Sequence, residues 1–186
     1  MLGFAFCGSF CTMAAALSSM EMLISRGYEI QPIMSDNAYT IDTRFHRASD
    51  FVRRVEAVAK REIIHTVAAA EPLGPKSPLE GLIIAPCTGN TLAKLAGGIT
   101  DTAVTMATKA HLRQDRPTLI ALATNDALSS NLSNLGRLIT RRSVYLVPMR
   151  QDDPVGKPHS LVARMSDIPD CWEAVMRGEQ KRPIFI

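Results

Sequence analysis

The sequence has no long hydrophobic run, few aromatic residues and no strong excess of charge of either sign. No apolar segment reaches the roughly 18 residues that a membrane-spanning helix needs. Aromatic residues make up 5% of the 186 residues, and 21 Lys and Arg stand against 18 Asp and Glu. The basic residues cluster only in pairs such as Arg53-Arg54 and Arg141-Arg142, whereas nucleic acids are bound by richer basic patches and aromatic platforms. We therefore expect neither a membrane nor a nucleic-acid partner.

Cysteine is also scarce, with four residues at positions 7, 11, 87 and 171. The chain contains neither a CxxC pair nor a Cys/His group at the spacing of a zinc site, and it is long enough to build a core without a disulfide scaffold. The apolar start, residues 1–7, lacks the basic segment and the small-residue cleavage site of a signal peptide. These features predict reduced thiols, no metal site and a cytoplasmic protein.

Two familiar nucleotide-binding motifs are missing. GxxxxGK[ST] does not occur, and Gly8-Ser9 lacks the GxGxxG spacing, so ATP hydrolysis is disfavoured. Asp36 lies where a Rossmann protein places the acid that binds the adenine ribose, which makes NAD binding a rival interpretation. Against it, Ser35 precedes the acid and the first loop has a single glycine, and a solvated turn is the favoured interpretation of Asp36. A phosphate-bearing cofactor remains open.

Short apolar runs alternate with helical patterns along the chain. Strands are predicted over residues 2–7, 28–34, 81–85, 117–123 and 144–147, the third ending at Pro86. Helices are predicted over 12–26, 50–61, 91–97, 101–113 with Asp101 as its cap, 134–142 and 170–177. Residues 35–37 read as a turn and the proline-rich 71–78 as a loop. Apolar strands between helices are typical of a parallel sheet covered on both faces. The fold class is thus α/β, a doubly wound parallel sheet in a three-layer α/β/α sandwich, with one domain over 1–186.

In such folds ligands bind outside the carboxyl ends of the strands. The loops expected there, 8–12, 35–37, 86–91 and 124–126, are all rich in small hydroxyl and amide side chains. Small residues let backbone N–H groups approach an anion, and the positive end of a helix dipole supports its charge. The loop that contains Gly8 and Ser9 therefore suits a phosphate, although Ser9 and Thr12 serve equally well as simple helix caps.

The segment from Ala85 to Asp101 has the sequence Ala-Pro-Cys-Thr-Gly-Asn-Thr-Leu-Ala-Lys-Leu-Ala-Gly-Gly-Ile-Thr-Asp. Together with Gly8-Ser9 and Ser35, it resembles the flavoprotein family of FMN-binding peptidyl-cysteine decarboxylases and flavin prenyltransferases. Further segments strengthen the resemblance and spread it over most of the chain: Thr43-Arg44-Phe45, Ala70-Glu71-Pro72-Leu73-Gly74-Pro75-Lys76, Thr124-Asn125-Asp126-Ala127-Leu128 and Gln151-Asp152-Asp153-Pro154.

The resemblance implies a flavoprotein-like fold and an FMN site built from the same loops. The family holds the phosphate in the first loop and at the serine after the second strand, which carries over to Gly8, Ser9 and Ser35. In the family, the loops after the third and fourth strands lie along the ribityl chain and the isoalloxazine ring. The matching positions in this sequence are Thr88, Gly89, Asn90, Thr91, Thr124 and Asn125. The family also implies a homo-oligomer, a trimer or a dodecamer, with flavin sites between the protomers.

The reaction implied is an oxidation rather than a decarboxylation or a prenyl transfer. The decarboxylases use a histidine before the third strand, for which His65 is the candidate, but the proline-rich insertion separates it from the strand. Their Pro-x-Met-Asn segment is replaced by 125–128, and the arginine of prenyltransferases is missing near Thr124. The resemblance instead implies an FMN-binding oxidoreductase component that works with an NAD(P)-binding partner protein on a small dicarboxylate. Its alternatives are a cofactor-free scaffold or stabilising subunit of the same complex, or an FMN-dependent enzyme similar to the decarboxylases or prenyltransferases.

A dicarboxylate substrate requires cations or N–H donors near the flavin. Lys76, Arg44 and Lys94 are candidates by their position in the sequence. For Lys94, three residues beyond Thr91, a solvated helix position is an equally good interpretation. No residue is singled out as a catalytic base.

Overall fold

The apolar runs of the sequence form the strands of one sheet in the computed structural model, which describes residues 1–74 and 79–186. Within these residues the sheet has seven strands: β1 (Leu2–Phe6), β2 (Ile30–Met34), β3 (Gly81–Cys87), β4 (Thr118–Thr124), β5 (Val144–Leu146), β6 (Met149–Arg150) and β7 (Leu161–Ala163). The order β2-β1-β3-β4 is parallel throughout. This order reverses direction between β1 and β3, and a ligand crevice is expected at such a point.

The far edge of β4 is shared by two different partners. Parallel β5 pairs with its first half, at Thr118–Ile120, and antiparallel β7 pairs with its end, at Ala123 and Thr124. β6 then pairs with β7 in antiparallel fashion. The predicted parallel sheet is confirmed for β1 to β5. β6 and β7 were not predicted, because they flank the proline- and charge-rich residues 151–160 and read with them as a loop. The sheet is therefore mixed.

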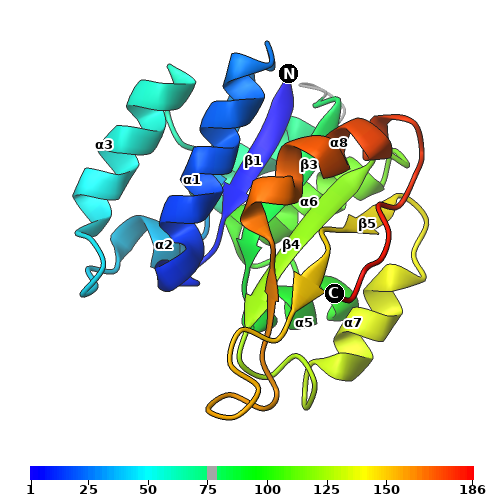
Figure 1. Ribbon diagram of the computed structural model, residues 1–186. Helices are drawn as coiled ribbons and strands as arrows, with labels where there is room; N and C mark the ends of the chain where they lie inside the picture. The colour runs from blue at the N-terminus through cyan, green and yellow to red at the C-terminus, as the bar shows by residue number, and fades with distance from the viewer. Residues whose placement is uncertain (75–78) are drawn as a thin grey trace.

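Eight helices among the described residues surround the sheet: α1 (Phe10–Ser25), α2 (Asp36–Thr40), α3 (Ala48–Ala59), α4 (Val67–Ala70), α5 (Gly89–Gly97), α6 (Ala103–Leu112), α7 (Leu132–Ile139) and α8 (Ile168–Met176). α1 packs with α3 and α8 on one face, and α5 packs with α6 and α7 on the other (Figure 1). The predicted three-layer sandwich is confirmed. No helix of residues 1–74 and 79–186 is both long and apolar enough to cross a membrane.

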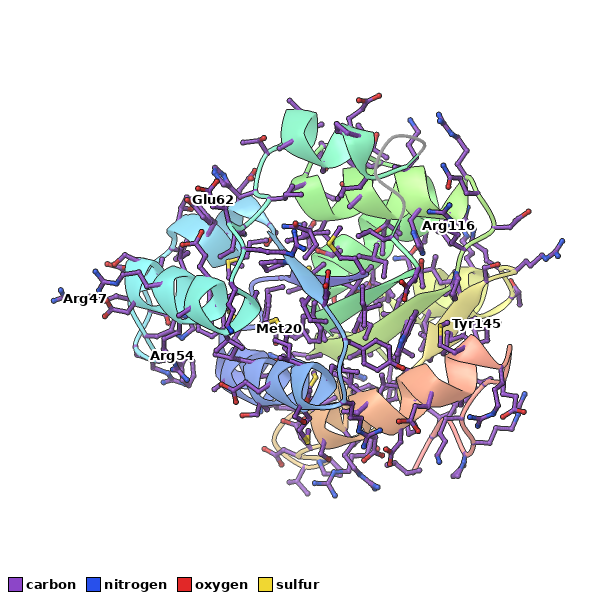
Figure 2. All side chains as sticks on the ribbon, turned by 90° about the horizontal axis from the view of Figure 1, so that it is seen from above. Met20, Arg47, Arg54, Glu62, Arg116 and Tyr145 are labelled. Carbon is purple, nitrogen blue, oxygen red and sulfur yellow. The ribbon has the colours of Figure 1, made fainter. Side chains whose placement is uncertain are left out.

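The core lies between the sheet and its two helical layers. The Phe4 and Phe6 rings are 5.0 Å apart, and Phe51 of α3 meets Phe6 edge-on at 5.5 Å. Met20, which is fully buried, lies between α1 and the sheet in Figure 2, whereas Arg47 and Arg54 extend into solvent beside α3. Such segregation of apolar and charged side chains supplies the main free energy of folding.

Trp172 of α8 shows how closely the layers pack. A Cβ atom at Gly81 would lie 1.7 Å from the Trp172 ring. The first residue of β3 is therefore a glycine because the buried indole leaves no room for a side chain there.

Four local predictions need correction. α6 begins at Ala103 and is capped by Thr102, not Asp101, because the Thr102 and Thr105 side chains each bond the other's backbone N–H. β3 continues through Pro86 to Cys87, with a register shift that accommodates the missing N–H. Residues 36–40 form α2 instead of an open turn. In the predicted loop 71–78, residues 71–73 form a 3₁₀ turn, and 75–78 lie outside the described residues.

Candidate functional site

A cleft of about 500 Å³ lies beyond the carboxyl ends of β1, β3 and β4. Its walls come from the loops after β1 and β4, from the 42–47 turn, and from the 151–160 loop, drawn in orange at the bottom of Figure 1. The structure brings five predicted site residues onto this cleft: Gly8, Ser9, Thr88, Thr124 and Asn125. The site prediction is therefore spatially coherent for the loops after three different strands.

The start of α1 forms one end of the cleft. Ser9 occupies the N-cap position, but its side chain makes no capping hydrogen bond to the helix. The Thr12 hydroxyl donates to the Ser9 carbonyl at 2.9 Å and lies 3.1 Å from the Ser9 hydroxyl. Because the first amides of a helix have no partner within it, they are left without a side-chain acceptor at the cleft. A Cβ at Gly8 would lie 3.3 Å from the Phe10 ring and 3.4 Å from the Asn37 Cβ, so the backbone passes close to both.

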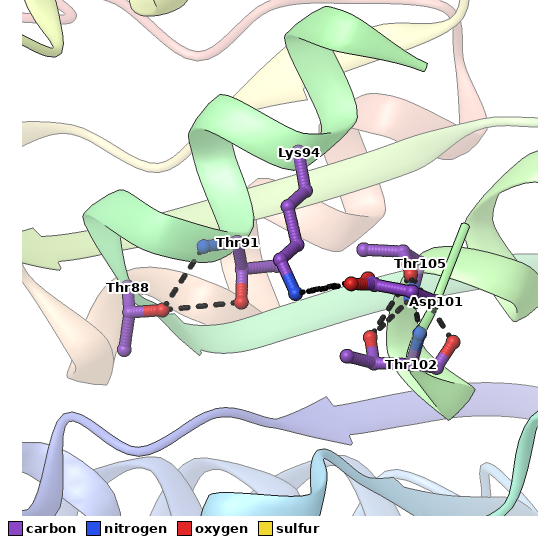
Figure 3. Close-up of polar contacts among 6 residues, drawn as sticks. All are labelled: Thr88, Thr91, Lys94, Asp101, Thr102 and Thr105. Carbon is purple, nitrogen blue, oxygen red and sulfur yellow. Dashed lines mark hydrogen bonds and ion pairs between the residues drawn. The ribbon is translucent and has the colours of Figure 1, made fainter. Parts of the chain in front are cut away.

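The start of α5 differs from that of α1, because the Thr88 side chain caps it. The Thr88 hydroxyl accepts from the Thr91 N–H at 3.2 Å and donates to the Thr91 hydroxyl at 3.1 Å (Figure 3). The Thr91 hydroxyl in turn donates to the Cys7 Sγ at 3.4 Å. Thr91 is thus buried behind Thr88 and orients it, while Asn90 projects into solvent at the helix end.

The loop after β4 is held by the Asp126 carboxylate. Asp126 accepts hydrogen bonds from the Thr124 hydroxyl at 2.5 Å, the Asn131 amide at 2.8 Å and the Ser130 hydroxyl at 3.2 Å. Partial burial alone would raise the pKa of Asp126, but these hydrogen bonds outweigh it and hold the pKa below its usual value. An ionised Asp126 therefore fixes Thr124 at the cleft.

Gly89 joins the α5 start to this network. A Cβ there would lie 2.6 Å from each of the Thr124 Oγ1, the Asp126 Oδ1 and the Asn131 Nδ2. Gly89 is therefore needed because its backbone packs directly against these three side chains, and it does not itself line the cleft. Sequence reasoning missed the role of Asp126, although a Thr-x-Asp sequence directly after a buried strand is a usable signal.

Ser35 lies beside the first loop without lining the cleft. Its N–H donates to the Phe6 carbonyl at 3.0 Å, and its side chain accepts from the Ala38 N–H at 3.4 Å, capping α2. It therefore sits at the end of β2, next to β1, as expected for a serine near a phosphate loop. Its hydroxyl is already engaged with α2.

The other charged and titratable candidates lie in different places. Lys94 forms an ion pair with Asp101 at 2.8 Å (Figure 3), and Lys76 lies outside the described residues. His65 stacks on Tyr39 with ring centroids 3.8 Å apart and lines a separate hollow at the β2 edge. Arg44 does line the cleft. Phe45, Asp152 and Lys157 also line it, although the sequence analysis did not predict these three residues to be in the site.

Two thiols lie buried near the floor of the cleft. Burial raises the pKa of Cys7 to about 11, against the hydrogen bonds from Thr91 and Thr88, and burial raises the pKa of Cys87 well above its ordinary value. Both are protonated at neutral pH, so neither is an activated nucleophile. Among residues 1–74 and 79–186, no group of three or more His, Cys, Asp or Glu side chains is placed to hold a metal ion.

The chain is similar to known proteins over nearly its whole length. The family model described as Flavoprotein matches residues 2–176. The B subunit of dipicolinate synthase from Bacillus subtilis (strain 168) is 40% identical over 185 residues, covering 100% of this chain and 92% of that one. The crystal structure of the dipicolinate synthase B subunit from Bacillus halodurans C superposes with a TM-score of 0.91 at 39% identity, covering 100% and 95% of the two chains.

A more distant solved structure, the FMN-dependent cysteine decarboxylase SpaF, is 26% identical with a TM-score of 0.66 and covers 91% of this chain and 93% of its own. Because the family model matches residues 2–176 and the relative from Bacillus subtilis is 40% identical along the whole of this chain, the chain belongs to the flavoprotein family.

Proposed function

We propose that the chain is the FMN-binding component of a dipicolinate synthase. In this proposal it acts with the enzyme's NAD(P)-binding A subunit to oxidise dihydrodipicolinate to dipicolinate, pyridine-2,6-dicarboxylate, in the mother-cell cytoplasm of a sporulating bacterium. The similarity to the dipicolinate synthase B subunit over the whole chain supports the reaction. The observation that carries the cofactor is the start of α1, which opens onto the cleft without a side-chain cap.

The cleft suits the phosphate of FMN at one end. The first amides of α1, which no side chain caps, and the positive end of the helix dipole favour an anion there. Gly8 lets the backbone approach closely, and Ser9 lines the cleft with its hydroxyl accepting a hydrogen bond from the Thr12 hydroxyl. We assign the phosphate to Gly8 and Ser9, with Ser35 supporting this end of the site from β2.

The residues after β3 and β4 suit the polar chain and the ring of FMN. Thr88, Thr124 and Asn125 line the cleft, and Asn90 lies one residue beyond the Gly89 contact. Thr91 acts indirectly, because it holds the Thr88 hydroxyl. Bound FMN supplies an acceptor for the two electrons that leave the substrate.

The protein's own contribution is binding and orientation. Conversion of the dihydropyridine ring into an aromatic pyridine removes two hydrogens, for which NAD(P)⁺ on the A subunit would be the final acceptor. Of the described residues, no histidine lines the cleft, which argues against the cysteine-decarboxylase branch of the family.

The Asp152 carboxyl is held ionised, since hydrogen bonds from Ser160 and Lys157 lower its pKa against the opposing effect of burial. It thus balances Lys157 at neutral pH.

The test is a visible absorption spectrum of the purified protein, taken before and after incubation with FMN and desalting, with any released chromophore identified by mass. We expect a flavin spectrum and FMN in near-stoichiometric amount. A colourless protein that takes up no FMN would overturn the proposal and favour the cofactor-free scaffold. The homo-oligomer, trimer or dodecamer, stays a prediction that light scattering on the same sample checks.

A further inference from the structure

Two cations reach the cleft from loops that lie far apart in the sequence. We propose that Arg44 and Lys157 are the residues that bind the carboxylates of a planar six-membered ring carrying two of them. This inference rests on the proposed function, because that function supplies the dicarboxylate. It assigns specificity to two side chains whose role is independent of holding FMN.

Lys157 is presented by a loop with many internal hydrogen bonds. Its ammonium pairs with the Asp152 carboxylate at 2.9 Å, and the other oxygen of that carboxylate accepts from the buried Ser160 hydroxyl at 2.5 Å. The Asp153 carboxylate accepts from the Gly156 N–H at 2.8 Å. β7, which follows this loop, pairs with the end of β4. The lysine is thus held against the cleft, although it lies far from the predicted site in sequence.

Arg44 is presented by a turn of similar character. The Thr43 hydroxyl accepts from the Phe45 N–H at 3.2 Å, and the Thr43 N–H donates to the His46 carbonyl at 3.0 Å. The Arg44 guanidinium lies over the Phe45 ring, 4.9 Å from its centroid. In residues 1–74 and 79–186 it forms no ion pair, so no carboxylate competes with an anion for its N–H donors.

The charged lining of the cleft has a net charge of +1 and favours an anionic ligand in addition to the phosphate at the α1 start. Among the described residues, its charged lining consists of Arg44, Lys157 and Asp152. Both Asp152 oxygens are engaged by protein donors, which lowers its repulsion of an incoming carboxylate. The phosphate has its own uncharged donors at the α1 start. Arginine and lysine therefore remain for the substrate, and Phe45 offers an apolar surface beside them.

The experiment measures discrimination between two and one carboxylate. Wild type, Arg44→Gln and Lys157→Gln are titrated by calorimetry with pyridine-2,6-dicarboxylate and with pyridine-2-carboxylate, each with and without added FMN. Arg47→Gln and Lys109→Gln serve as controls, because both residues are exposed and neither lines the cleft. Circular dichroism and FMN content are recorded for every variant.

We expect wild type to prefer the dicarboxylate, and each cleft variant to lose about tenfold or more of that preference, the scale of one hydrogen bond to a charged group. FMN content and the control variants should be unchanged. An equal affinity of wild type for both ligands, no binding of either, or an unaltered preference in both cleft variants would overturn the inference.

Loss of FMN from Arg44→Gln or Lys157→Gln would also overturn it, since the cation would then belong to the cofactor. Failure of wild type to bind FMN would overturn the proposed function instead. The titrations without FMN would still decide the carboxylate assignment.

Discussion

Ser9 differs from the other hydroxyl residues that stand at helix starts. Ser35, Thr66, Thr88 and Thr102 each accept a hydrogen bond from the helix they precede. A side-chain cap typically contributes about 1 kcal/mol, and α1 lacks it. The lost stability is understandable if another acceptor takes the same amides. A phosphate at the cleft is such an acceptor.

At the residue scale, we predict that Asn90→Asp abolishes FMN retention without weakening the fold. An aspartate in the first turn of α5 stabilises the helix by roughly 0.3–1 kcal/mol, while its negative charge repels the flavin phosphate and ring oxygens. Absorption after desalting and urea unfolding measure the two effects. Ser133→Asp adds the same charge at the equivalent second position of α7. Ser133 is exposed like Asn90, but no residue within two positions of it lines the cleft, whereas Thr88 lies two positions before Asn90 and does; the Ser133 variant should retain FMN. Retention by Asn90→Asp would remove Asn90 from the site.

At the element scale, His111 fastens the end of α6 to the start of β4. Its Nε2 lies 2.9 Å from the Pro117 carbonyl oxygen, and the side chain is buried. Burial lowers the pKa of His111 from 6.5 to about 4, against the Pro117 hydrogen bond, which raises it, and with Arg116, which lowers it further. The imidazole is therefore neutral in the folded protein at physiological pH.

This buried histidine makes stability depend on pH. Between pH 6.5 and about 4 the unfolded chain binds a proton that the folded chain does not, so the contribution present above pH 6.5 is lost as the pH falls, by about 3 kcal/mol in total at 1.36 kcal/mol per unit. His111→Gln, which keeps an N–H donor, should show a flatter profile in urea unfolding at pH 7, 6 and 5. The exposed His159→Gln serves as the control. Parallel profiles for wild type and His111→Gln would contradict the prediction.

At the scale of the whole molecule, the cleft depends on segments that only the complete sheet brings together. Its walls include residues after β1, β3 and β4, the turn before α3 and the loop before β7. The unfolded chain has no such cleft. A ligand that fits it therefore binds the folded state alone and stabilises the entire fold by mass action.

We predict that FMN raises the melting temperature in a manner that depends on its phosphate. At a concentration 100 times the dissociation constant, the stabilisation is about 2.7 kcal/mol, which corresponds to roughly 5–10 °C for a chain of this size. Riboflavin, which lacks the phosphate, should give a much smaller shift at the same concentration. Differential scanning calorimetry measures both. Equal shifts would exclude the phosphate site at α1, and no shift with either would argue against a flavin site.

Particular residues show how far the sequence alone reaches. β1, α1 and β2 could be predicted because the spacing of apolar residues and the positions of turn residues are local properties of the sequence. The loops that contain Gly8, Ser9, Thr88, Thr124 and Asn125 were predicted to meet because carboxyl-end loops of parallel strands share one edge. The resemblance to the flavoprotein family then singled out these residues within the loops. Asp101 was wrongly predicted as the cap of α6. Asp101 and Thr102 compete for this position, and Thr102 occupies it because Thr102 and Thr105 each accept a hydrogen bond from the other's backbone N–H.

The sequence by itself determined the layered α/β fold, the loops that meet at the cleft and, through resemblance, the flavoprotein family. Tertiary structure alone decided that β7 pairs with the end of β4, that the 151–160 loop thereby forms a wall, and that Lys157 and Arg44 line the same cleft while Lys94 pairs with Asp101. The physical reason is distance along the chain. Local patterns encode elements, whereas the pairing of short strands and the charge balance of a cleft arise from long-range contacts that no local pattern records.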